Sequence, residues 1–227
     1  MTELLDNRPW RIGHAAGVVF AGLAAVTVAA ILIGPEITDS ETFRVLIPVQ
    51  TLVQLGLIAW WASRGARRRF SLGFRFEGRD LIGLPLGVGF QIAASIALLP
   101  IVLWVLDGEA PTQEVVESAS GLVGIDIVLV IIGAVLLAPL AEELVFRGVL
   151  LRALIVSRGR RFATYVSAAV FAAIHLLDPN AWMVVPILFA LGIVLAKVTI
   201  STGRIAQAVF THMAFNLVAV GSLFLVE

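Results

Sequence analysis

Long apolar stretches alternate with short polar ones along the chain, and this pattern predicts about seven membrane-spanning helices. A helix needs about 20 mostly apolar residues to cross the hydrocarbon core of a bilayer. The predicted spans cover residues 12–33, 43–61, 81–106, 125–152, 162–177, 181–199 and 205–226. The first stretch exceeds the about 7–15 residues of a signal-peptide core, so we expect it to be retained as a helix. We therefore expect an all-α, polytopic transmembrane bundle that forms one integral membrane domain over residues 1–227.

The charges between the predicted spans indicate which way the chain crosses the membrane. Arginine clusters follow the second and fourth spans, and Lys197 and Arg204 lie at the end of the sixth. The alternate loops, including the acidic segment 107–120, carry Asp and Glu, with Arg44 as their one cation. Cytoplasmic loops carry the excess of Lys and Arg in membrane proteins. We expect the amino terminus in the cytoplasm and the carboxyl terminus outside.

Composition supports the membrane assignment and removes several kinds of chemistry. The 227 residues are 59% hydrophobic and 14% charged, whereas soluble domains are about 45–50% apolar and about 25% charged. A soluble enzyme is therefore excluded. The chain has no cysteine, which excludes disulfides, thiolate nucleophiles and cysteine metal ligands. Its formal net charge is zero, so we expect no nucleic-acid partner, and the apolar composition makes membrane lipid the expected surrounding.

Polar side chains inside the last four predicted spans indicate a functional site. An ionisable group at the bilayer centre costs about 2.5–3.5 kcal/mol on the insertion scale. The chain nevertheless places ionisable or polar residues on three spans. They are Glu142, Glu143, Arg147, His175, His212 and the neutral Asn216. At about 1.5 Å per residue from the cytoplasmic boundary, Glu142 lies at about 15–24 Å, His175 at about 21 Å and the last pair at about 12–18 Å. These depths overlap, which predicts one intramembrane polar cavity.

Helical spacing suggests a role for each group. Glu143 and Arg147 are four residues apart with the acid first, an arrangement that favours an ion pair. Glu142 then points about 100° away from that pair and is a candidate general base for water. His212 and Asn216 are also four residues apart, so both face the same cavity. They could stabilise an oxyanion or bind a metal, and His175 could share a water molecule with Glu142.

The residues themselves leave the mechanism open. The segment carries no serine or cysteine nucleophile motif, and Glu-Glu is not the His-Glu-x-x-His zincin signature. Hydrolysis by an activated water remains. Glu142, His175 and His212 would match the ligand set of a divalent metal such as zinc, and metal-free activation fits equally well. A proton or ion pathway is a further alternative, because intramembrane ionisable residues also serve transport.

In these three motifs the chain resembles a known family. Glu-Glu-x-x-x-Arg (142–147), Phe-x-x-x-His (171–175) and His-x-x-x-Asn (212–216) are similar to the motifs of the CPBP intramembrane proteases. These are also called the Abi or CAAX-protease family, often labelled metalloproteases, and include the type II CAAX prenyl endopeptidases. Residues 125–217 carry the motifs and form the expected catalytic core.

The resemblance implies an intramembrane peptide hydrolase. By position, Glu142 and His175 would activate water, His212 and Asn216 would stabilise the tetrahedral intermediate, and Glu143 and Arg147 would support the site. Because the chain is short and has no extra domain, we expect a bacterial plasma-membrane member of this family that acts on a lipophilic or membrane-bound peptide. A non-catalytic immunity or scaffold protein of the same fold is the alternative.

Overall fold

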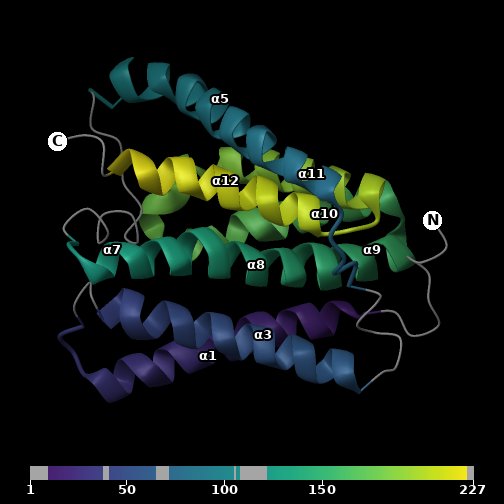
Figure 1. Ribbon diagram of the computed structural model, residues 1–227, viewed down its shortest axis with the longest axis horizontal. Coiled ribbons are helices and arrows are strands. Elements are labelled where there is room, and N and C mark those ends of the chain that lie inside the picture. The colour runs from purple at the N-terminus through teal and green to yellow at the C-terminus, as the bar shows by residue number, and fades with distance from the viewer. Residues whose placement is uncertain (1–9, 38–40, 65–71, 105, 108–121, 224–227) are drawn as a thin grey trace.

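Helices account for nearly all of the chain that the structure describes. The computed structural model describes residues 10–37, 41–64, 72–104, 106–107 and 122–223. The arginine run at 67–69 and most of the acidic segment 107–120 lie outside the described residues. The described helices run roughly along the longest axis of the molecule (Figure 1). The all-α prediction is confirmed for this part of the chain.

Within the described ranges the helical segments form seven rods, several built from consecutive α, π and 3-10 turns. The first three rods are α1 (Ile12–Ile33), η2 with α3 (Thr42–Leu46, Ile47–Ser63) and η3 with α5 (Gly78–Ile82, Gly83–Trp104). The fourth rod joins α7 (Ile125–Val130), η4 (Ile131–Leu137), α8 (Ala138–Glu143), η5 (Leu144–Leu150) and α9 (Leu151–Arg158). The last rods are α10 (Arg160–Ile174), α11 (Val185–Thr202) and α12 (Ala206–Leu223), with the turns η6 (His175–Leu177) and η7 (Pro179–Met183) after α10.

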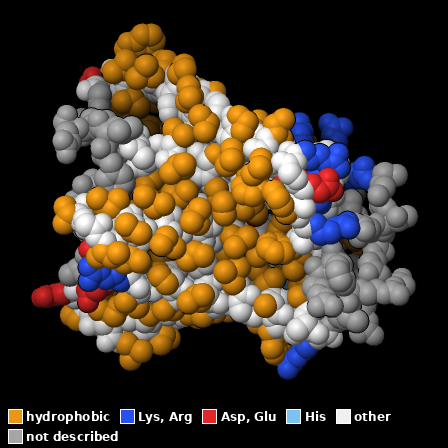
Figure 2. Space-filling model, viewed as in Figure 1, with side chains coloured by type: hydrophobic (Ala, Val, Ile, Leu, Met, Phe, Trp, Pro, Cys, Tyr) orange, Lys and Arg blue, Asp and Glu red, His pale blue; other side chains and the backbone are white. Residues whose placement is uncertain are grey.

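Five of these rods are long and apolar enough to cross a membrane, among the residues described. The other two are α10 and α12. His175 follows the end of α10, and α12 carries His212 and Asn216. The fifth predicted span is longer than its helix, because α10 ends at Ile174 and the apolar pair Leu176 and Leu177 belongs to the turn η6. Much of the outer surface is apolar (Figure 2). Side chains such as Leu32 and Trp104 are about 80% exposed, as lipid-facing residues should be.

The long fourth rod lies at the centre of the bundle. In Figure 1 it runs between the α1–α3 pair on one side and α12 on the other, with α5 beyond α12. Helices α10 and α11 pack against each other and against the fourth rod. Both faces of α8 and η5 are therefore covered by protein. This explains why every residue from Glu143 to Leu154 is buried.

Helix α12 is held closely by α5 through two glycines. A Cβ atom on Gly83 or Gly87 would overlap backbone atoms of Gln207 or Thr211. Small residues let transmembrane helices approach backbone to backbone. Glycine at both positions thus sets the position of α12, which carries His212 and Asn216.

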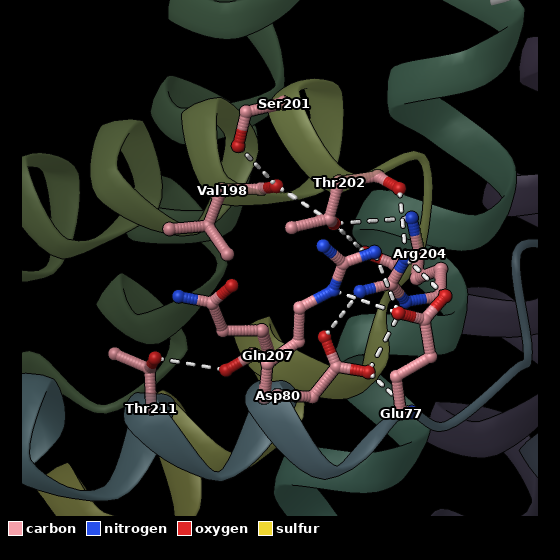
Figure 3. Close-up of polar contacts among 9 residues, drawn as sticks. Glu77, Asp80, Val198, Ser201, Thr202, Arg204, Gln207 and Thr211 are labelled. Carbon is pink, nitrogen blue, oxygen red and sulfur yellow. Dashed lines mark hydrogen bonds and ion pairs between the residues drawn. The ribbon is translucent and has the colours of Figure 1, made fainter.

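An ion-pair network fixes the start of α12 at the basic end of the molecule. The Arg204 guanidinium donates to both carboxylate oxygens of Asp80, at 2.8 and 3.1 Å, and lies 2.8 Å from Glu77 (Figure 3). Asp80 is fully buried. Arg152 donates to the Gly203 carbonyl at 2.9 Å. The segment before α5 and the turn before α12 are therefore joined by charge-assisted hydrogen bonds.

At the opposite end, Arg44 is paired with an acid. Its guanidinium lies 2.6 Å from Asp126 Oδ1 and 3.1 Å from Oδ2. Arg44 is the cation predicted on the acidic side of the membrane. The structure explains it as one half of a bidentate ion pair that joins η2 to α7. Most other Lys and Arg side chains visible in Figure 2 gather at the basic end.

Candidate active site

Four of the predicted residues contact one another where α8, η5 and α12 meet; they are Glu142, Glu143, Arg147 and His212. Glu142 and Glu143 lie at the end of α8, Arg147 on η5, and His212 and Asn216 on α12. His175 is the C-cap residue of α10, one residue beyond the helix on which the sequence predicts it. The Phe171 ring lies beside both histidine rings, with centroids 5.1 Å from His175 and 5.5 Å from His212.

Glu143 is the fully buried centre of the cluster. Its Oε1 atom lies 2.9 Å from the Arg147 guanidinium and 3.0 Å from Nδ1 of His212. The ion pair predicted from the four-residue spacing is therefore confirmed. The contact with His212 was not predicted, and it links the first motif directly to the third.

Arg147 is buried on every side, and three kinds of group stabilise its charge. Besides Glu143, it donates to the Gly192 carbonyl at 3.4 Å and lies 4.5 Å from the Phe171 ring centroid, a cation–π distance. Gly192 is needed for close helix packing, because a Cβ there would lie 2.9 Å from Ala168. The α11 backbone therefore contributes to the site, although its sequence carries no polar residue at this depth.

Glu142 differs from Glu143 in its access to the outside. Its side chain is 30% exposed, whereas that of Glu143 is fully buried. Glu142 Oε2 lies 3.6 Å from Nε2 of His212, so Glu142 is not isolated from the other polar groups. The adjacent acids thus sit in two environments, one closed by Arg147 and one open to a water molecule or a substrate.

The hydrogen bonds fix which nitrogen of each histidine carries a proton. A carboxylate and a carbonyl can only accept hydrogen bonds. His212 Nδ1 faces Glu143 and His175 Nδ1 lies 2.8 Å from the Phe171 carbonyl, so both Nδ1 atoms carry hydrogen. This also explains the Phe-x-x-x-His spacing, because the His175 ring reaches the carbonyl four residues back, where α10 ends. Each Nε2 atom remains available for other partners.

Asn216 makes its contact with the fourth rod rather than with the acids. Its Nδ2 donates to the Ala134 carbonyl at 2.9 Å, and the residue is partly exposed. Asn216 lies one helical turn beyond His212 on α12. Asn216 therefore contacts η4, and His212 contacts α8, from the same side of α12.

The donor set does not form a complete metal site. Among the described residues, no three His, Asp or Glu side chains are arranged to hold a metal ion. Glu142 and His212 approach each other, but a catalytic zinc takes three protein ligands. His175, the third candidate ligand, is not grouped with them.

Sequence reasoning missed Gly192 and Ala134, whose backbone carbonyls accept hydrogen bonds from Arg147 and Asn216, and it assigned no role to Pro139. A carbonyl gives no signal in the sequence, and a glycine on an apolar helix is common. Pro139 was visible three residues before Glu142, and a proline inside a predicted span indicates a broken backbone hydrogen bond.

The fold and the site define a polytopic helical membrane protein with a buried cluster of glutamate, arginine, histidine and asparagine. Residues 124–218 match the family described as type II CAAX prenyl endopeptidase Rce1-like. The match begins just before α7, ends two residues after Asn216, and confirms the resemblance seen in the three motifs. Neither a curated protein nor a solved structure gives a significant match to the chain.

Proposed function

We propose that the protein is an intramembrane endopeptidase that hydrolyses a peptide bond of a membrane-associated or lipophilic peptide or protein. The observation that carries the proposal is the pair of adjacent acids in unlike environments. Glu143 is closed off by Arg147 and His212, while Glu142 remains accessible beside His212 Nε2 at 3.6 Å. The family match over the same segment supports the same chemistry.

In the proposed mechanism, Glu142 is the general base. It removes a proton from a water molecule, whose oxygen attacks the carbonyl carbon of the scissile bond. His175, with Nδ1 bound to Phe171, presents Nε2 as a second acceptor for that water. The proton taken by Glu142 then passes to the leaving amine, which completes hydrolysis and restores the carboxylate.

His212 and Asn216 stabilise the oxyanion of the tetrahedral intermediate. Because Nδ1 of His212 donates to Glu143, donation from Nε2 to an oxyanion requires the imidazolium form. Glu142, Glu143, Arg147 and His212 then carry two negative and two positive charges. A charge-neutral cluster is the form that a low-dielectric interior tolerates best. Glu143 thus orients His212, and Arg147 in turn holds Glu143 in place.

We propose water activation without a resident metal, because the described side chains supply two grouped ligands rather than three. The membrane assignment rests on five helices long enough to span it. We further propose that the protein resides in a bacterial plasma membrane with its basic end in the cytoplasm. Lys and Arg gather at the end where α9, α11 and the start of α12 meet (Figure 2), which fits this orientation.

The deciding experiment is a cleavage assay on purified protein in lipid nanodiscs, read by mass spectrometry. Substrates are a prenylated Cys-containing peptide and its unlipidated counterpart. We expect the wild type to cleave the lipidated peptide, and Glu142→Gln to lower kcat by about 10²–10⁴-fold, as loss of a general base does. His175→Ala should act in the same direction.

A matched control separates catalysis from folding. Glu36→Gln changes an exposed acid outside the bundle core and should leave kcat unchanged. Full activity in Glu142→Ala would exclude the proposed base. A scaffold role would be favoured if Glu142→Gln retained the full cellular phenotype while the purified wild type cleaved no substrate. Proton flux in proteoliposomes that depended on Glu142 would instead favour a transporter.

A further inference from the structure

The π-helical segment η4 leaves one carbonyl without a backbone donor. At the end of this segment the Ala138 N–H bonds to the carbonyl of Gly133, five residues earlier. The next N–H in the same register would belong to residue 139 and would bond to Ala134. Residue 139 is proline, which has no N–H. The Ala134 carbonyl therefore has to find its donor elsewhere.

Asn216 supplies the missing hydrogen bond. Its Nδ2 lies 2.9 Å from the Ala134 oxygen, across 82 residues of sequence. An amide nitrogen has two N–H bonds. The bond to Ala134 uses one of them and fixes the plane of the amide, so the direction of the second N–H is also fixed.

The reason for placing a proline here lies in competition for that carbonyl. A backbone N–H at position 139 is held next to the helix by the chain itself, whereas the Asn216 side chain must be ordered at an entropic cost. An ordinary residue at 139 would thus capture the carbonyl and release the amide. The widened π turn and the proline together reserve one acceptor for Asn216.

We propose that Pro139 is a positioning residue: by withholding a backbone N–H it reserves the Ala134 carbonyl for Asn216 and so aims the second Asn216 N–H at the reacting carbonyl. The second half of this statement rests on the proposed function, because only a hydrolase needs an oxyanion donor. The first half, the tether itself, does not depend on activity.

The activity test compares Pro139→Ala with wild type in the cleavage assay. We expect kcat to fall about 10²-fold, near the about 10²–10³-fold cost of losing one oxyanion donor, with KM within about twofold. The melting temperature should stay equal or rise, since alanine restores a helical hydrogen bond. A purely structural role for Pro139 would not lower kcat while preserving stability. Pro100→Ala, at the exposed proline inside α5, is the matched control and should leave kcat unchanged.

The stability test is a double-mutant cycle in melting temperature. Asn216→Ala should destabilise the wild type, because it leaves the Ala134 carbonyl unpaired. The same substitution should cost much less in Pro139→Ala, where the backbone supplies the donor. Pro139→Ser serves in the same way if the alanine variant does not fold.

The outcomes distinguish the two levels of the proposal. Equal costs of Asn216→Ala in both backgrounds would refute the tether. Coupled stabilities with wild-type kcat in Pro139→Ala would refute the positioning role. If the wild type cleaves no substrate, the proposed function fails, and the stability cycle still decides whether Pro139 reserves the carbonyl.

Discussion

Nδ1 of His212 lies 3.0 Å from Oε1 of Glu143, the same oxygen that Arg147 approaches at 2.9 Å. One buried oxygen therefore holds a cation on its own rod and a histidine on another. Glu143 sits behind His212 as seen from Glu142, so it orients a reacting group without reaching the substrate.

Glu143→Gln should lower kcat by about 10²-fold or more, with little change in KM. Glutamine removes the negative charge beside His212 and weakens the hydrogen bond that orients its ring. Loss of the carboxylate that orients a catalytic histidine has a similar effect in other enzymes. Steady-state kinetics on the purified variant measure this. A large rise in KM with unchanged kcat would instead show that Glu143 contributes to substrate binding.

Arg147→Met should destabilise the protein strongly. It leaves the Glu143 carboxylate buried without its cation, which costs about 3–5 kcal/mol in proteins. The double variant Glu143→Gln with Arg147→Met removes both charges and should recover most of that loss while remaining inactive. Melting temperatures of the three variants test the idea, and additive losses would contradict it.

Asp80→Asn should lower the melting temperature, because it weakens the ion pair that fixes the start of α12. The hydrogen bond that Arg204 donates to Asp80 raises the pKa of Arg204, and a raised pKa keeps the guanidinium charged. The ion pair therefore stabilises the fold at neutral pH. It would be lost at acid pH, where the Asp80 carboxylate takes a proton, and at extreme alkaline pH, where Arg204 loses one. Arg79→Gln is the control, since the Arg79 side chain is 75% exposed and such pairs contribute little.

Two introduced cysteines should test the orientation of the chain. The natural sequence has none, so a single cysteine gives a clean signal with a membrane-impermeant maleimide. Ser157 and Ser222 are exposed at opposite ends of the helices. We expect Ser222→Cys to be labelled in intact cells and Ser157→Cys only after permeabilisation. The reverse pattern would invert the proposed topology.

Removal of divalent metals should leave the cleavage rate within about twofold. The described residues group two candidate ligands, whereas catalytic zinc uses three. Dialysis against EDTA followed by the cleavage assay measures this. A complete loss that added zinc restores would show that His175 moves to join Glu142 and His212 around a metal.

The sequence predicted the parts of the fold that depend on hydropathy and on spacing within one helix. The extent of α1 follows from its apolar stretch, and so does the start of α12. The sixth predicted span, residues 181–199, was wrong at both ends, because residues 179–183 form the turn η7 and α11 runs from Val185 to Thr202. The Glu143–Arg147 pair follows from four-residue spacing, because both groups lie on one rod. The end of α10 at Ile174 did not follow, since Leu176 and Leu177 continue the apolar pattern into a turn.

Contacts between rods were beyond the sequence. Equal depth placed His212 near the acids, but depth does not decide whether it faces Glu142 or Glu143. That choice depends on how α12 is rotated, which the contacts of Gly83 and Gly87 set. The Asn216 contact depends on the π register of η4, and a change of one residue in hydrogen-bond register leaves no mark on hydropathy.

The Arg44–Asp126 pair has a consequence for biogenesis. The two residues are 82 positions apart, so at about 5–20 residues per second the ribosome needs about 4–16 s to make the acid after the base. In the proposed topology, the second helix during that interval carries Arg44 toward the outer face without Asp126, against the usual charge bias. Correct insertion of the early helices therefore depends on a carboxylate that is synthesised later, and its removal should appear first as mis-inserted nascent chains.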